Sequence, residues 1–134
     1  QDAEDLQVIS AALQDAVAKV GEIDFDPRAR TLTVQLNRFR WEAGGRSRRG
    51  ERVRSALQLG SVLAVRSRRL RLGARDAVVE VLSVGFEPAD PPGGKVRLIL
   101  AGDGEVQAEV EALDVLLVDL SDPWPARRIP AHEG

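Results

Sequence analysis

The sequence predicts an α+β domain: an N-terminal amphipathic helix packed on a strongly curved, mostly antiparallel sheet of about six strands, a partly closed barrel, with a short C-terminal helix. Three observations lead to this prediction. Apolar side chains recur at spacings of three and four in the first 21 residues, whereas most later segments alternate with a period of two. Short turns separate those segments, which favours antiparallel neighbours. The length of 134 residues suits a single domain with one ordinary core.

Residues 1–21 are predicted to form the covering helix. Asp2 is a suitable N-cap, and Glu4 and Asp5 lie at the positive end of the helix dipole. Gly21 can supply the left-handed residue that ends such a helix.

One face of this helix is apolar. Leu13 lies at its middle, so we expect that side chain to be almost fully buried. Asp15 lies about 200° further round the helix and is expected on the solvent side. The apolar residues are Leu6, Ile9, Leu13, Ala16, Val17 and Val20.

Residues 22–112 are predicted to form a β-meander. Its first hairpin joins a strand at 22–26 to a strand at 31–41 through the turn at 26–29. Apolar side chains change parity at residues 37–38 of the second strand. Either a bulge resets the register there, or the end of the strand is covered on both sides.

The middle of the meander contains a loop, a long strand and a connector. Residues 42–51 hold three glycines and three arginines without an apolar period, which predicts a mobile loop. Apolar residues on one parity predict one strand over residues 53–65, bent or bulged at Gly60. Residues 66–75 read as a basic connector. Residues 77–86 are apolar on both parities, which is typical of a central strand.

The last two strands of the meander form the clearest hairpin in the sequence. Strands at 96–100 and 106–110 alternate regularly on either side of the turn at 102–104. The tail, residues 123–134, is expected to be extended, with Trp124 holding it against the body.

The pattern then changes in a way that allows two interpretations. Spacings of three and four favour a short helix over residues 112–122, which ends before Pro123. A strand through Leu113, Val115 and Leu117 is the alternative. The apolar residues concerned are Leu113, Leu116, Leu117 and Leu120.

The net charge of −2 conceals a strong asymmetry along the chain. Residues 1–27 carry −6, residues 28–75 carry +12 and residues 76–134 carry −8. The basic block could attract an anionic partner, or its arginines could pair with the acidic ends of the same fold. The candidate anion-binding residues are Arg46, Arg48, Arg49, Arg52, Arg54, Arg66, Arg68, Arg69 and Arg71.

The residue inventory disfavours catalysis. The absence of cysteine excludes disulfides, thiolate metal sites and cysteine nucleophiles. His132 is the only histidine and lies near the chain end, and no Gly-rich loop precedes a helix as a phosphate cradle requires. Glu105, Glu109 and Glu111 lie on the same side of a predicted strand. They could bind a cation, or they could form an ordinary solvated strand face. We therefore predict no cofactor and no metal, and favour a non-enzymatic role.

The expected location is the cytoplasm. No apolar run approaches the roughly 20 residues that span a bilayer, so no membrane partner is predicted. A chain without cysteine is compatible with a reducing compartment.

Two further groups of residues are candidate sites. Phe39 and Trp41 lie among basic residues, a combination that can stack bases and hold phosphates, although so few aromatic residues more often belong to a core. A pocket inside the curved sheet is the other candidate. Its possible lining residues are Gln14, Asn37, Arg38 and Trp41.

Six short stretches resemble the alphaproteobacterial proteins grouped as domain of unknown function 2948. The resemblance covers nearly the whole chain and implies a small, single-domain bacterial protein without an assigned activity, whose relatives usually begin a few residues upstream of Gln1. The stretches are Asp2-Ala3-Glu4-Asp5-Leu6, Leu13-Gln14-Asp15-Ala16, Asn37-Arg38-Phe39-Arg40-Trp41-Glu42, Val65-Arg66-Ser67, Phe86-Glu87-Pro88 and Pro130-Ala131-His132.

Three hypotheses about function follow. The favoured one is a binding module whose arginine-rich surface holds nucleic acid, an acidic protein or an anionic metabolite. The second is a small-molecule binder or enzyme with a pocket inside the sheet. The third is an interaction domain, for example a homodimer, that pairs through a strand edge.

Overall fold

The computed structural model describes residues 3–39, 51–122 and 124–125. Within these ranges the chain forms one α-helix, α1 (Ala3–Leu13), two 3-10 turns, η1 (Val20–Glu22) and η2 (Ala101–Asp103), and ten strands. The strands are β1 (Val17–Lys19), β2 (Ile23–Asp26), β3 (Thr31–Phe39), β4 (Glu51–Leu59), β5 (Val62–Arg68), β6 (Val78–Pro88), β7 (Gly94–Leu100), β8 (Glu105–Val110), β9 (Val115–Asp119) and β10 (Trp124–Pro125).

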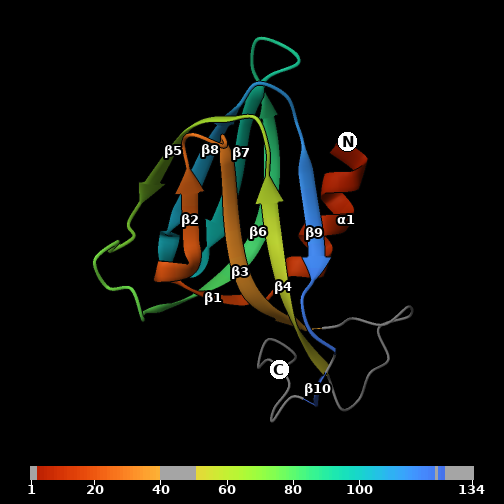
Figure 1. Cartoon of the computed structure of the whole chain (residues 1–134), viewed down its shortest axis with the longest axis vertical. Helices are drawn as coiled ribbons and strands as arrows, with labels where there is room; N and C mark the ends of the chain where they lie inside the picture. The colour runs from red at the N-terminus through yellow and green to blue at the C-terminus, as the bar shows by residue number, and fades with distance from the viewer. Residues whose placement is uncertain (1–2, 40–50, 123, 126–134) are drawn as a thin grey trace.

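The strands form one bent sheet with the order β10-β4-β3-β1-β6-β7-β8-β5, in which β2 also pairs with β3 and β9 with β4. Figure 1 shows β2, β3, β4 and β9 in front of β7 and β8, with α1 at the side. Every strand pair in the described residues is antiparallel, which confirms that part of the prediction.

The predicted fold class is otherwise wrong in three respects. In the part of the chain that the structure describes, the sheet has ten strands rather than about six. It is not a partly closed barrel, because within the described ranges the two ends of the strand order, β10 and β5, do not pair with each other. The expected C-terminal helix over residues 112–122 is the strand β9.

The segment that forms β9 is a strand because its backbone pairs with β4 and its inward side chains pack in the core. Ser55 to Leu59 of β4 pair with Asp119 to Val115 in continuous register. Val115 and Leu117 face the core, whereas the alternate residues Leu116 and Val118 are exposed. The leucine spacing that suggested a helix therefore mixes two faces of a strand, and the alternative interpretation is correct.

The N-terminal helix is shorter than predicted. It ends at Leu13, and the left-handed residue that follows is Asp15, with φ 68°, rather than Gly21. Residues 17–19 pair with β6 instead of extending the helix. Gly21 has a different role, because a Cβ there would lie 3.0 Å from the Cβ of Arg75.

The first predicted hairpin is confirmed, since β2 pairs with β3 from Ile23 opposite Val34 to Asp26 opposite Thr31. The parity change in β3 involves no bulge, because its pairing with β4 runs without interruption to Phe39. Phe39 is buried on the face opposite to Leu36. The end of β3 is therefore covered on both sides.

The long strand predicted over residues 53–65 bends from one half of the sheet into the other. It forms β4 and β5, separated by Gly60 and Ser61. A Cβ on Gly60 would lie 2.5 Å from Oδ2 of Asp114, so the bend needs a glycine or a shift of that side chain. The basic connector begins only after Arg68, where β5 ends.

The later strands agree well with the sequence. The strand predicted over residues 77–86 is β6, which lies between β1 and β7, and the clear hairpin is β7 and β8. Of the predicted tail, residues 124–125 pair with β4 as β10. Predictions about residues 42–50, 123 and 126–134 fall outside the described residues.

The core lies between the two halves of the sheet and under α1. It consists of leucine and valine side chains from both halves, joined by Leu6 and Leu13 of the helix. Oγ of Ser10 accepts a hydrogen bond of 2.9 Å from the backbone nitrogen of Val84, which fixes α1 against β6.

Candidate anion-binding site

Strands β5, β8 and β7 present long polar side chains on their outward side. The intervening residues, such as Val96, Leu98 and Val106, are buried in the core, so strand alternation places the polar ones on the opposite face. We call this surface the outer charged face. It comprises Ala64, Arg66 and Arg68 on β5, Glu105, Gln107 and Glu109 on β8, and Lys95 and Arg97 on β7.

The strand register brings the central residues of this face together. Ala64 lies opposite Glu109, which in turn lies opposite Lys95. In the next row, Arg66 lies opposite Gln107. Because side chains directly opposite each other have Cβ atoms about 5 Å apart, long side chains in both rows can reach a common point.

Glu105 anchors one side of the outer charged face. Its side chain is only 8% exposed. Oε2 accepts hydrogen bonds of 2.6 Å from Nε of Arg97 and 2.9 Å from Nε2 of Gln107, and Nη1 of Arg68 lies 3.8 Å from Oε1. The hydrogen bond from Arg97 lowers the pKa of Glu105 and raises the pKa of Arg97.

A hollow of about 80 Å³ opens on the outer charged face. The presence of Ala64 at its edge, where the other positions of the face carry long side chains, leaves the space open. The hollow is lined by Ala64, Arg66, Lys95, Gln107 and Glu109.

Two cationic side chains of the hollow have no ionic partner among the residues that the structure describes. Neither Arg66 nor Lys95 has a carboxylate oxygen within 4.0 Å there. This holds although Glu109 lies directly opposite Lys95 across the strand pair. The hollow therefore offers two positive charges to a ligand.

Arg52 and Arg54, which the sequence placed in the same patch as Arg66, lie on β4. Arg54 pairs with Glu22 and donates to Oδ1 of Asn37 at 3.2 Å. The guanidinium of Arg52 lies 4.2 Å from the ring centre of Phe39, and desolvation lowers its pKa. Both arginines are thus engaged within the fold.

The remaining predicted arginines lie in other places. Arg68 belongs to the outer charged face, Arg69 lies 3.9 Å from Asp103 as an exposed pair, and Arg71 is exposed in the connector. Arg46, Arg48 and Arg49 are outside the described residues. The structure therefore brings together Arg66 and Arg68 and adds Lys95, Arg97 and Gln107, which the sequence did not single out. It also adds Glu109, which the sequence suggested only as a cation ligand or a solvated residue.

The predicted pocket inside the sheet is not assembled. Gln14 is exposed just after α1, and Asn37 and Arg38 point to opposite faces of β3. Trp41 lies outside the described residues. The space between the two halves of the sheet is filled by leucine and valine side chains, which argues against a ligand cavity there.

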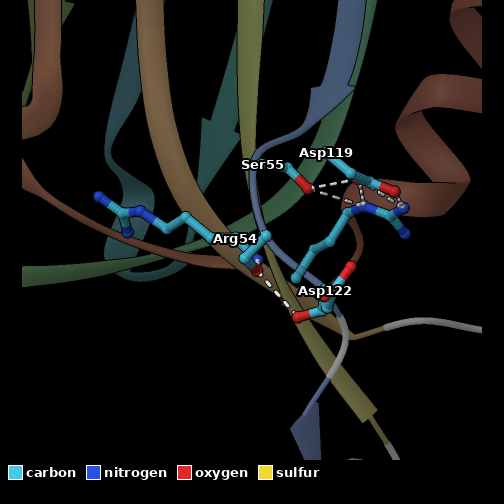
Figure 2. A network of polar contacts seen from close by, with 6 residues as sticks. Arg54, Ser55, Asp119 and Asp122 are labelled. Carbon is cyan, nitrogen blue, oxygen red and sulfur yellow. Dashed lines mark hydrogen bonds and ion pairs between the residues drawn. The ribbon is translucent and has the colours of Figure 1, made fainter.

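Arg38 instead belongs to a polar network with Ser55 and Asp119, both of which are labelled in Figure 2. Its Nη2 donates to Oδ1 and Oδ2 of Asp119 at 2.9 and 3.1 Å, and its Nε donates to Oγ of Ser55 at 3.1 Å. Ser55 donates in turn to Oδ1 of Asp119 at 2.8 Å. Figure 2 also shows that the side chain of Arg54 points away from this network. Since these three side chains satisfy one another, the network joins β3, β4 and β9 rather than binding a ligand.

The fold and the site define a small antiparallel β protein with one covering helix and a charged hollow on its surface. The chain matches, over residues 1–132, the model of a family described as "Protein of unknown function (DUF2948)", and it belongs to this family. No curated protein and no solved structure matches the chain. The family has no assigned function, so any inference about function rests on the geometry of the site.

Two further findings concern the described residues only. They include no helix that is long and apolar enough to cross a membrane. They also include no group of three histidine, cysteine, aspartate or glutamate side chains placed to hold a metal ion. Glu105 and Glu109 thus contribute to the outer charged face and not to such a group.

Proposed function

We propose that this protein is a non-enzymatic binding module and that the hollow on the outer charged face holds an anionic group of its partner. The observation that carries the proposal is that Arg66 and Lys95 line one hollow without an ionic partner among the described residues. Elsewhere on the surface, Arg38 and Arg54 are engaged by carboxylates of the fold.

The size of the hollow limits the group that it can hold. A volume of about 80 Å³ is well below the roughly 300–1,000 Å³ of sites that enclose drug-sized ligands. It corresponds to a few water molecules, each of which occupies about 30 Å³ in the liquid. A single carboxylate or phosphate group therefore fits, whereas a whole nucleotide does not.

The charge pattern disfavours nucleic acid as the partner. Glu105 and Glu109 lie among the cations of the outer charged face, and a polyphosphate chain would be repelled by them. Phe39, the described aromatic residue that was expected to stack bases, is only 2% exposed and lies beneath Arg52. An anionic metabolite or a single acidic group of a protein fits this surface better.

The proposal is tested by titrating the protein with acetate and inorganic phosphate at low ionic strength while recording backbone amide NMR shifts. We expect the largest shifts at Ala64 and Gln107. Arg66→Gln or Lys95→Gln should weaken binding about threefold to fivefold, since an ion pair in contact with water contributes up to about 1 kcal/mol.

Arg28→Gln and Lys19→Gln are the matched controls. Both residues are exposed, in the β2–β3 turn and on β1, and neither lines the hollow. Equal losses for the controls and for the hollow variants would indicate general charge attraction. That result, or shifts elsewhere in the protein, would contradict the proposal.

A second candidate function, a homodimeric interaction domain, is favoured by β9. This strand pairs with β4 on one side and has no strand on its other side among the described residues. Its outward side chains Leu116 and Val118 are exposed, as is Leu120 just after it. Antiparallel pairing of two copies about a two-fold axis would bring these apolar side chains together. Light scattering should then show a dimer that Val118→Lys dissociates, and a monomeric wild-type protein would exclude it.

We also propose a bacterial, specifically alphaproteobacterial, protein that works in the cytoplasm. The support is compositional: arginine greatly outnumbers lysine, as in proteins of GC-rich genomes, and the chain has no cysteine. Fractionation of cells followed by immunodetection tests the location, and recovery in a membrane or secreted fraction would contradict it.

A further inference from the structure

The hollow contains hydrogen-bond acceptors as well as cations. A simple anion would bind the cations but would donate no hydrogen bond to the acceptors. Glu109 lines it together with Arg66 and Lys95. Since a carboxylate can only accept hydrogen bonds, it attracts a donor or a positive charge and repels a negative one. The lining therefore has a negative and a positive part within one small space.

Gln107 extends the accepting part. Its Nε2 donates to Oε2 of Glu105 at 2.9 Å. The carboxylate of Glu105 is itself fixed by Arg97 at 2.6 Å, so the orientation of the amide is determined. Since the amide nitrogen is held by Glu105, the acceptor that Gln107 can offer to the hollow is its carbonyl oxygen Oε1.

From this arrangement we infer that the ligand held in the hollow is a free α-amino acid. This inference rests on the function proposed above and narrows the class of ligand. The carboxylate of the amino acid binds Arg66 and Lys95, and its ammonium group binds Glu109 and Oε1 of Gln107. In an α-amino acid the carboxylate and the ammonium group are bonded to the same carbon atom. The two charged groups are therefore close enough together to fit in a hollow of about 80 Å³.

The openness of the site sets the expected strength and selectivity. Arg66, Lys95 and Glu109 are exposed side chains, and ion pairs in contact with water are weak. A dissociation constant on the order of 1 mM is therefore expected. The side chain of the amino acid would extend into solvent, so glycine and alanine should bind about equally well.

Glu109→Gln separates an amino-acid site from a general anion site, because it changes the affinities for two probes in opposite directions. The probes are glycine and acetate, titrated by amide NMR into the intact protein, with methylammonium as a third ligand. In Glu109→Gln the affinity for glycine should fall about fivefold, since the ammonium loses its partner. The affinity for acetate should rise about twofold to threefold, since a repelling charge is removed.

Two more variants complete the design. Lys95→Gln should lower the affinity for both glycine and acetate, whereas Gln107→Leu should lower the affinity for glycine and leave that for acetate nearly unchanged. Lys19→Gln, on β1, should change neither. All of these positions except Gln107 are exposed, and amide spectra of each variant verify that the fold is intact.

The possible outcomes distinguish failure of the amino-acid inference from failure of the proposed function. Higher affinity of Glu109→Gln for both probes, or wild-type binding of acetate as tight as that of glycine, would overturn the amino-acid inference and leave the anion site in place. Binding of neither probe to the wild-type hollow would overturn the proposed function as well. If methylammonium binds as tightly as glycine, Arg66 and Lys95 contribute nothing to binding, and this result would also overturn the proposed function.

Discussion

Leu13 closes the interface between α1 and the sheet. Its side chain is fully buried, at 0% exposed, in agreement with the sequence. Leu13→Ala should cost roughly 2–5 kcal/mol, the usual range for such core truncations. Val8→Ala, at an exposed position of the same helix, should change stability by about 0.5 kcal/mol or less. Urea unfolding of both variants tests this, and similar losses would mean that α1 packs through another face.

Asp15 is buried, although the sequence predicted that it would lie on the solvent side of the helix. Its side chain is only 6% exposed, its backbone has φ 68°, and its nitrogen donates to the oxygen of Val81 at 2.9 Å. A continued helix would have placed it in solvent. Because the helix ends at Leu13, the chain instead turns at Asp15 toward β6.

Substitution of Asp15 should therefore be costly rather than neutral. Asp15→Ala should lose roughly 1–2 kcal/mol, because alanine cannot make the local side-chain hydrogen bonds that let aspartate and asparagine adopt the left-handed region. Asp15→Asn should lose less. Asp24→Ala, at an exposed position on β2, is the control. Thermal and urea unfolding measure the differences, and a loss below about 0.5 kcal/mol for Asp15→Ala would remove the argument from backbone strain.

At the scale of elements, the β6–β7 hairpin depends on the absence of a side chain at Gly94. A Cβ there would lie 2.4 Å from the backbone oxygen of Glu87, whereas a Cβ on Gly85 of the partner strand meets no atom within 4 Å. Gly94→Ala should cost about 1–3 kcal/mol, as overpacking does. Gly85→Ala should be neutral or slightly stabilising. Chemical denaturation compares them, and a tolerated Gly94→Ala would show that the hairpin can shift without loss.

The position of β9 depends on Asp119. Removing its carboxylate leaves the largely buried guanidinium of Arg38 and the buried hydroxyl of Ser55 without the acceptor that joins them. Asp119→Ala should cost roughly 1.5–3 kcal/mol. Asp122→Ala, just beyond the strand and exposed, should cost about 0.5 kcal/mol or less. Unfolding by urea checks both values, and equal effects would mean that the network does not hold β9.

The elements that the sequence predicted correctly are those with local signals. Hairpins β2–β3 and β7–β8 have regular alternation around turn residues, and both formed as expected. The strand β1 was missed, and β9 was only the less favoured of two interpretations, because their hydrogen-bond partners, β6 and β4, lie far away in the sequence. Apolar spacing alone does not reveal such partners. Val17, for example, fits the predicted helix face as well as the strand that pairs with β6.

The same distinction applies to the candidate site. Arg66 was predicted from charge alone, and Lys95, Gln107 and Glu109 alternate regularly on the β7–β8 hairpin. Their meeting depends on the pairing of β5 with β8, which joins segments about 40 residues apart and has no local signal. The hollow was therefore not predictable as a site, although most of its lining residues could be placed on outward strand faces.

At the scale of the whole molecule, folding brings part of the basic block against acidic side chains. Ion pairs join the basic block, residues 28–75, to the acidic segments on either side of it. Arg30 reaches Glu111, Arg54 reaches Glu22, and the other pairs, Arg38–Asp119, Arg68–Glu105 and Arg69–Asp103, follow the same rule. These five arginines thus pair within the fold, whereas Arg66, like the exposed Arg28 and Arg71, has no ion pair among the described residues. Arg66 differs from Arg28 and Arg71 in that it lines the hollow.

Resistance of the molecule to acid should depend in part on Glu105. Its pKa is lowered by the hydrogen bond from Arg97 and then by that from Gln107, against the opposing effect of desolvation. The folded state therefore binds this proton less readily than the unfolded chain. The stabilisation is complete above the ordinary carboxyl range, about pH 4–5, and is lost as the pH falls through the lowered pKa.

Glu105→Gln removes the titrating group, so the free energy of unfolding should fall less steeply between about pH 5 and pH 2 in this variant than in the wild type. Arg97→Ala removes the principal cause of the shift and should flatten the same part of the profile. The measurement is urea unfolding at a series of pH values and constant ionic strength. The two substitutions act on the same proton, so Glu105→Gln combined with Arg97→Ala should flatten the profile no further than Glu105→Gln alone. Parallel curves for wild type and Glu105→Gln would show that Glu105 has the same pKa in the folded and unfolded protein, and the hydrogen bond from Arg97 would then have no role in acid stability.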